Sequence, residues 1–193
     1  MARPKNDPNI KPARERIIDA FWILLDKGSY HDITIQSLSI EAKVNHNTFY
    51  YHFDSIDSLA KTAFLENLDS DISRKILRMM FEPNVDTHII LENPDFISRG
   101  NKAKLFTRGD STYLLCIFKE SIMSAWLNAI GITIDKLSAE DRMDLDFIFS
   151  GLTTIIGQTI DPSSTIQPAK LFQHELGVGI LATLNRLKTT YSL

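Results

Sequence analysis

The side chains best suited to chemistry lie close together in residues 42–53, which have the sequence AKVNHNTFYYHF. Amide, imidazole, hydroxyl and phenol groups are interleaved here with phenylalanine rings, and they form hydrogen bonds without needing a full charge. Base edges and phosphate oxygens of duplex DNA are partners of this kind. We therefore expect the turn and second helix of a helix-turn-helix, with that helix facing a major groove.

The elements before this stretch would hold it in place. Apolar residues recur every three or four positions in residues 12–27, which predicts a helix with one buried face between Pro12 and Gly28. Thr34 is a favourable N-cap for a short second helix, and Asn45 is one for the third. Short helices are marginal alone, so we expect the three to pack as one unit. The apolar positions of the first helix are Ile17, Ala20, Phe21, Leu24 and Leu25.

The composition is that of a globular protein: 193 residues, 44% of them hydrophobic and 23% charged, with a net charge of -3. Residues 1–16 are basic, with Arg3, Lys5, Lys11, Arg14 and Arg16 against two acidic residues. The single cysteine, Cys116, is predicted to be a buried hydrophobic residue in a reducing cytosol. No apolar run approaches the ~18 residues of a membrane span, and no signal peptide is recognisable, so we expect a cytoplasmic protein.

The rest of the chain is also predicted to be helical, because no stretch alternates polar and apolar residues. The predicted segments are a fourth helix over 55–80, a loop with short helical turns over 81–109, and helices over 110–130, 138–160 and 168–187. The helix over 110–130 is apolar nearly all round and is expected to be central. Ser138 and Asp141 have the spacing of a capping box. The predicted fold class is all-α.

Residues 17–59 resemble the DNA-binding domain of the tetracycline-repressor (TetR) family of bacterial transcription regulators. The matching motifs are Ile17-x-x-Ala20-Phe21-x-x-Leu24, Gly28, Thr34 with Leu38, Ala42-x-Val44, Thr48-Phe49-Tyr50-x-His52-Phe53, and Ser55 with Leu59. The resemblance implies a flexible arm over 1–11 and a three-helix helix-turn-helix domain over 12–54. A long fourth helix would join these to a C-terminal helical dimerisation and ligand-binding domain over 55–193.

The resemblance implies a transcriptional regulator that binds a palindromic operator on double-stranded DNA as a homodimer, with repression favoured over activation. The C-terminal domain would sense a small molecule or a protein partner. A two-fold dimer also suits the physics, because one short recognition helix makes few base contacts alone. We expect no cofactor, no metal and no membrane association.

Phosphate contacts are expected from residues at the helix starts and late in the recognition helix. Thr34 and Thr48 can each offer a hydroxyl donor near a helix N-terminus, where the helix dipole also favours an anion. Tyr51 and His52 match family positions that bind backbone phosphates. The set of expected DNA contacts also includes Asn45.

Base contacts are expected from His46 and Asn47, early in the recognition helix, and from Tyr50 one turn later. Asparagine pairs with adenine, histidine donates to guanine, and a tyrosine ring lies against a thymine methyl. For Tyr50, packing within the domain is an equally good alternative. Phe49 and Phe53 have the spacing of core residues.

Three residues depart from the family pattern. Lys43 stands in the turn where glycine is usual, and a left-handed conformation there would cost about 1 kcal/mol relative to glycine. Either the turn is less tight, or the lysine reaches phosphate. Asn47 also replaces a frequent glycine, and Ile56 replaces a lysine that would contact phosphate.

The C-terminal helices are expected to be shared between the core and a dimer interface. The residues of this seam are Phe147, Ile155, Ile156, Leu176, Ile180 and Leu184, with Gly151, Gly157, Gly177 and Gly179 permitting close approach. A ligand pocket could be lined by Tyr113, Phe118, Met123, Trp126 and Phe147. Ordinary core packing is the alternative for each of these aromatic and sulfur-containing side chains.

Two other classes of function were weighed. An enzyme is disfavoured because the histidines lack metal-ligand spacing and no phosphate-binding loop or nucleophile motif is present. Asp141, Asp144 and Asp146 could suggest a metal site but fit a solvated helix start better. The remaining alternative is a helical interaction and dimerisation protein with reduced or no DNA binding.

Overall fold

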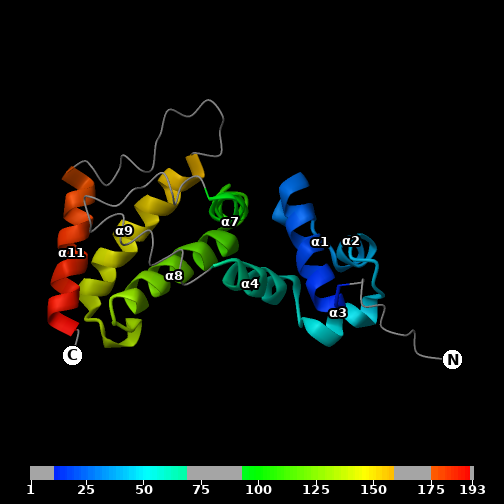
Figure 1. Ribbon diagram of the computed structural model, residues 1–193, viewed down its shortest axis with the longest axis horizontal. Coiled ribbons are helices and arrows are strands. Elements are labelled where there is room, and N and C mark those ends of the chain that lie inside the picture. Colours follow the sequence, from blue (N-terminus) through cyan, green and yellow to red (C-terminus); the bar gives the residue numbers. More distant parts are fainter. Residues whose placement is uncertain (1–10, 69–92, 159–174, 192–193) are drawn as a thin grey trace. The chain divides into compact units, whose positions relative to one another are not determined.

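The computed structural model describes residues 11–68, 93–158 and 175–191 (Figure 1). All elements in these ranges are helical, which confirms the all-α prediction. The chain divides into two compact units, residues 1–63 and 64–193. The division lies inside α4 (Ile56–Asn67), whereas the sequence pattern suggested a boundary before this helix.

The N-terminal unit is built on α1 (Ala13–Lys27), whose predicted apolar stripe forms the core. Ile17, Phe21 and Leu25 are completely buried, and Gly28 ends the helix as its C-cap. The helix α1 contacts both of the short helices that follow, α2 (Ile35–Glu41) and α3 (His46–His52). The predicted three-helix arrangement is therefore present.

Capping side chains set the ends of the short helices. The Thr34 hydroxyl accepts from the backbone N–H of Ser37 at 3.0 Å, and the Ser37 hydroxyl accepts from the N–H of Thr34 at 3.0 Å. This reciprocal capping box satisfies N–H groups that the first turn of a helix leaves without partners. A 3₁₀ turn, η1 (Tyr30–Asp32), precedes it, and the Tyr30 hydroxyl donates to Asp57 of α4. Each short element is thus tied to a neighbour.

The helix α4 ends at Asn67, earlier than the predicted end near residue 80; residues 69–80 lie outside the described ranges. Arg99 of α7 (Pro94–Leu105) donates to the carbonyl of Asn67 at 3.1 Å, and the Asn67 amide donates to the Arg99 carbonyl at 3.0 Å. The first of these bonds gives a partner to the Asn67 carbonyl, which lies at the C-terminus of α4 and has none within that helix.

The helix α7 itself corrects the prediction of a loop with short helical turns over 81–109. It is mostly polar, so no apolar stripe signalled it. Local interactions stabilise it instead: Asn93 accepts from the N–H of Asp95 at 3.0 Å, and Asp95 pairs with Arg99 at 2.9 Å one turn later.

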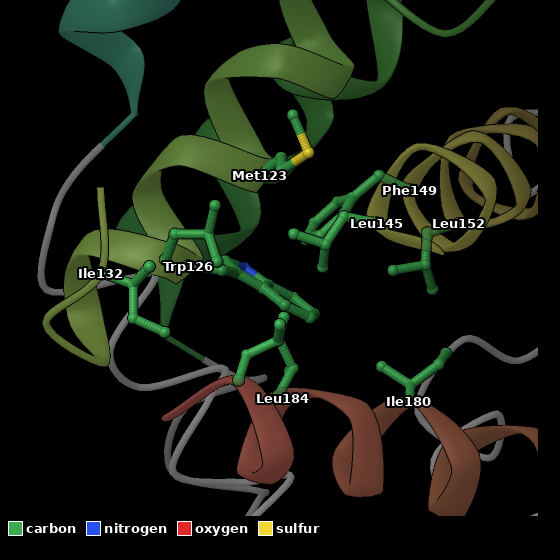
Figure 2. Packing of buried hydrophobic residues seen from close by; sticks show 10 residues of the cluster. Met123, Trp126, Ile132, Leu145, Phe149, Leu152, Ile180 and Leu184 are labelled. Carbon is green, nitrogen blue, oxygen red and sulfur yellow. The ribbon is translucent and has the colours of Figure 1, made fainter. Parts of the chain in front are cut away.

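The core of the C-terminal unit lies between α8 (Thr112–Ala129), α9 (Ala139–Gln158) and α11 (Glu175–Tyr191). Figure 2 shows Trp126 of α8 between Leu145 of α9 and Leu184 of α11. The Trp126 ring meets Phe149 edge-on at 5.2 Å. A short 3₁₀ turn, η2 (Ile134–Lys136), connects α8 to α9.

The structure corrects the expectation that α8 is surrounded on all sides. Leu114, Met123 and Leu127 are buried, but Cys116 and Tyr113 are exposed. Cys116 is therefore not the buried hydrophobic residue that its apolar surroundings predicted. In the part of the chain that the structure describes, α8 is covered by α9, α11 and Phe64, and the side with Tyr113 and Cys116 is exposed.

The last helix continues to Tyr191, beyond the predicted end at residue 187, while its predicted start at 168 lies outside the described residues. Within the described ranges, none of the helices combines the length and the apolar character that crossing a bilayer requires.

Candidate nucleic-acid interface

The turn between α2 and α3 has the tight geometry that the family pattern predicts, even though a lysine occupies it. Lys43 has a φ of 53°, in the left-handed region that favours glycine. The backbone N–H of Lys43 donates to the Ile40 carbonyl at 3.2 Å, and that of Val44 donates to the Ser39 carbonyl at 3.0 Å. Of the two alternatives for Lys43, the looser turn is therefore wrong.

Asn45 sets the start of the recognition helix. Its Oδ1 accepts from the backbone N–H of Thr48 at 2.8 Å and from the Thr48 hydroxyl at 2.9 Å. The Thr34 hydroxyl likewise donates to the Ser37 hydroxyl at 3.2 Å. The protons of both threonine hydroxyls, which we expected to donate to phosphate, are thus used within the caps.

The recognition helix separates its aromatic residues by face. Phe49 is completely buried and Phe53 is nearly so, as their spacing predicted. Tyr51 points outward and is 84% exposed. Tyr50 packs partly within the domain: its ring meets Phe49 edge-on at 5.6 Å, and the residue remains 51% exposed.

The polar side chains expected to contact bases lie on the exposed side of α3. His46 and Asn47 are exposed, and the His46 imidazole meets the Tyr50 ring edge-on at 5.2 Å. His52 is half-buried, with its ring 4.9 Å from that of Tyr51. His46 and Tyr50 form one continuous edge of the helix, because residues four apart lie above one another.

The basic residues of the N-terminus that the structure describes are engaged with the protein. Lys11 pairs with Asp19 at 2.7 Å, and this hydrogen bond raises the pKa of Lys11. The Arg14 guanidinium lies over the Phe53 ring, 5.7 Å from its centroid. Arg16 donates to backbone carbonyls in the turn. Sequence reasoning treated these residues only as a basic tail and missed their contacts.

Comparison with known proteins leaves the family open. No family model matches the chain, and no curated protein matches it either. Among solved structures, it is similar to the fatty acid degradation regulator FadR from Bacillus halodurans, at 16% sequence identity and a TM-score of 0.48. The match covers 92% of this chain and 95% of that one. A likeness of this extent does not by itself indicate a function.

The residues expected to line a ligand pocket lie in different surroundings. Phe118 packs against Phe64, with ring centroids 5.6 Å apart. Met123 and Trp126 belong instead to the core between α8, α9 and α11. Tyr113 is 36% exposed, and Phe147 is 80% exposed on the outside of α9. Phe118, Met123 and Trp126 are thus buried in the core, as the alternative of ordinary core packing described.

Of the three aspartates near the start of α9, two share one cation, Arg186, and the third binds another. Asp141 accepts from Arg186 at 2.6 Å and from the Tyr191 hydroxyl at 2.5 Å, and Asp144 accepts from Arg186 at 3.3 Å. Asp146 pairs with Lys119 at 3.1 Å. Asp141 is only 7% exposed, so the expectation of a solvated helix start is wrong for this residue.

The environment of Asp141 favours its ionised form. Hydrogen bonds from Tyr191, Arg186 and Ser138 lower the pKa of the Asp141 carboxyl below its ordinary value of 3.8. The backbone N–H of Asp141 donates to the Ser138 hydroxyl at 3.1 Å, as the capping-box spacing predicted. In a complete capping box the Asp141 side chain would also accept from the backbone N–H of Ser138. Here that N–H donates to the Tyr191 hydroxyl instead, at 3.0 Å.

Proposed function

We propose that this protein is a sequence-specific, DNA-binding transcriptional regulator of the tetracycline-repressor type, acting in the cytoplasm as a homodimer on a palindromic operator. One observation carries the proposal: a short helix, fixed by an N-cap and a tight left-handed turn, buries Phe49 and presents His46, Asn47 and Tyr51 to solvent. A polar, aromatic face on a short helix is suited to the major groove. Repression is the mode of action we favour.

The exposed residues divide into two proposed roles. Asn47 and His46, with the exposed part of Tyr50, would contact base edges. Tyr51 and His52 would contact phosphates, which position the helix without distinguishing sequences. The Asn45 amide oxygen is occupied by the cap, so its amide nitrogen is the group left to donate to DNA.

Lys43 supports the DNA-binding proposal through its conformation. A left-handed lysine costs about 1 kcal/mol relative to glycine, and its exposed ammonium makes no ion pair among the described residues. A cation retained in a strained turn beside the recognition helix suits a phosphate contact, which would also compensate for the lysine missing at Ile56.

The proposed homodimer would use the outer faces of α9 and α11. Met143, Phe147 and Val178 are 66%, 80% and 60% exposed there. A Cβ at Gly151 or Gly179 would meet nothing within 4 Å, so a second copy could approach closely at both positions. Sedimentation equilibrium at micromolar concentration tests the dimer, and a monomer would contradict it. The C-terminal unit would then connect DNA binding to a small molecule or a protein partner.

The test of the function is selection of bound fragments from random DNA at physiological salt, followed by two variants. The double variant Tyr51→Phe, His52→Ala should weaken binding about equally on all sequences, because it removes phosphate contacts. Asn47→Ala should relax the preference at one position per half-site, at a cost of about 1–3 kcal/mol. If no sequence is enriched, the chain is an interaction protein without operator binding, and the proposal is wrong.

A further inference from the structure

We propose that Arg16 is a positioning residue for DNA recognition: it holds the turn at Lys43 in its left-handed conformation and so sets the direction in which the recognition helix leaves the turn. This inference rests on the proposed function. Arg16 lies on α1 and would not itself contact a base.

The contact that supports the inference spans the N-terminal unit. One guanidinium nitrogen of Arg16 donates to the Ala42 carbonyl at 2.8 Å and to the Lys43 carbonyl at 3.0 Å. These carbonyls belong to the C-cap of α2 and to the left-handed residue that follows it. A positive charge at this end of α2 also suits the negative end of the helix dipole.

The shape of the donor group explains why these bonds constrain the turn. The two hydrogens of a guanidinium nitrogen lie in one plane and diverge at a fixed angle, so both carbonyls must converge on that nitrogen. Rotation of Lys43 out of the left-handed region would turn its carbonyl away and break one bond. The two bonds therefore select the conformation that lysine disfavours and glycine would adopt readily.

Arg16 is partly buried, and one of its nitrogens is completely enclosed. Its Nε is buried and has no hydrogen-bond partner in the part of the chain that the structure describes. Leaving a buried donor unsatisfied opposes folding. The side chain keeps this orientation because it is anchored at the other end by the two carbonyls. A surface cation free to bind phosphate would not have a buried Nε and two bonds to backbone carbonyls.

The experiment compares Arg16→Met, which keeps the apolar stem and removes the donors, with Arg16→Lys as the conservative variant. Lys27→Met is the matched control, because Lys27 is another α1 cation near α2 and pairs with Glu41 at 3.9 Å. Affinities for the selected operator and for random DNA are measured over a range of salt concentrations. Urea unfolding gives the stability of each variant.

For Arg16→Met we expect the ratio of specific to non-specific affinity to fall about tenfold with the salt dependence unchanged. Arg16→Lys should recover part of the ratio, and Lys27→Met should leave it intact. In a Lys43→Gly background the loss caused by Arg16→Met should shrink, because glycine adopts this turn unaided. A salt slope reduced by about one, with equal losses on all DNA, would show a direct phosphate contact instead. A change in stability alone would also overturn the inference.

Amide hydrogen exchange separates this inference from the proposed function. In Arg16→Met, the amides of Lys43 and Val44 should exchange about tenfold faster, while the amide of Phe53, bonded within α3, should not change. This result is independent of DNA. If the wild-type protein selects no operator, the proposed function fails while faster exchange still supports the local role of Arg16. Unchanged exchange at Lys43 and Val44 would refute that role.

Discussion

Each unit of the protein contains an arginine that joins segments distant in the sequence, but the two arginines have different partners. Arg16 of the N-terminal unit donates to two neutral backbone carbonyls in the turn. Arg186 of the C-terminal unit binds the carboxylates of Asp141 and Asp144. The first contact fixes a backbone conformation, whereas the second joins the start of α9 to the end of α11. Only the second includes a group that titrates in acid.

The two units also differ in what stabilises their helices. The short helices α2 and α3 depend on caps made by side chains within three residues, at Thr34 and Asn45. The long helices α8, α9 and α11 depend on a shared apolar core. Caps therefore fix the ends of the two short helices beside the turn, whereas a large apolar core joins the three long helices of the C-terminal unit.

The two tryptophans allow this comparison to be tested separately in each unit. Trp22 lies in the N-terminal unit and Trp126 in the C-terminal unit, and both are buried. In a Trp126→Phe background the fluorescence of the remaining Trp22 follows unfolding of the N-terminal unit. In a Trp22→Phe background the fluorescence of Trp126 follows unfolding of the C-terminal unit. Urea unfolding in these two backgrounds gives the unfolding free energy of each unit separately.

The largest effect is expected for Gly157→Ala. A Cβ at this position would lie 2.5 Å from the Thr107 carbonyl oxygen, and a backbone atom cannot move aside cheaply. We expect a loss of about 1–3 kcal/mol in the unfolding free energy of the C-terminal unit, reported by Trp126. Gly100→Ala, in α7 of the same unit, is the control: a Cβ there would meet nothing within 4 Å, so alanine should stabilise the helix by up to about 1 kcal/mol. Equal effects at the two glycines would contradict the close approach.

A smaller effect, in the other unit, is expected for Asn45→Ala. It removes the acceptor for the N–H and the hydroxyl of Thr48, so the N-terminal unit should lose about 1 kcal/mol as reported by Trp22. Asn45→Asp keeps the acceptor and should retain most of the stability. If Asn45→Ala lowers the stability reported by Trp126 by the same amount, the units unfold together and the comparison between them fails.

These local caps are also the part of the fold that the sequence predicted best. Thr34 and Asn45 were identified as N-caps because a cap and its partner lie within three residues of each other. For Lys43, the resemblance to a pattern with glycine at that position raised the left-handed conformation but left a looser turn as an alternative. Such features depend on neighbouring residues, which a single sequence displays.

Long-range features could not be predicted in the same way. Arg16 donates to carbonyls, and every residue has a carbonyl, so no residue type in the turn marked the partner. In α9, Phe147 and Phe149 are two residues apart and project about 200° apart around the helix. The apolar pattern placed Phe147 in the seam shared between the core and the interface and in a candidate pocket, but Phe149 is the one in the core. The sequence has apolar residues on both faces of this helix, and only the packing of α8 and α11 distinguishes them.

The smallest expected effect is a loss of stability at low pH, and it distinguishes the two arginine contacts most directly. The folded protein lowers the pKa of Asp141, so this carboxyl adds stability above its ordinary pKa of 3.8 and loses that contribution as the pH falls through the lower, folded value. The contribution is modest because half of the Arg186 side chain is exposed and solvent screens the pair. Arg16 has no carboxylate in its contact with the turn, so the turn should not respond.

We therefore expect the urea midpoint reported by Trp126 to fall more steeply below pH 4 in the wild type than in Asp141→Asn, which cannot ionise at this position. Asp144→Asn is the control: this residue is more exposed and 3.3 Å from Arg186, so its acid profile should stay closer to that of the wild type. The midpoint reported by Trp22 should be the same for Asp141→Asn and the wild type at each pH. A matching acid shift at Trp22 would mean that the stability of the recognition helix depends on the Asp141 contact, and the two arginines would then belong to one cooperative unit.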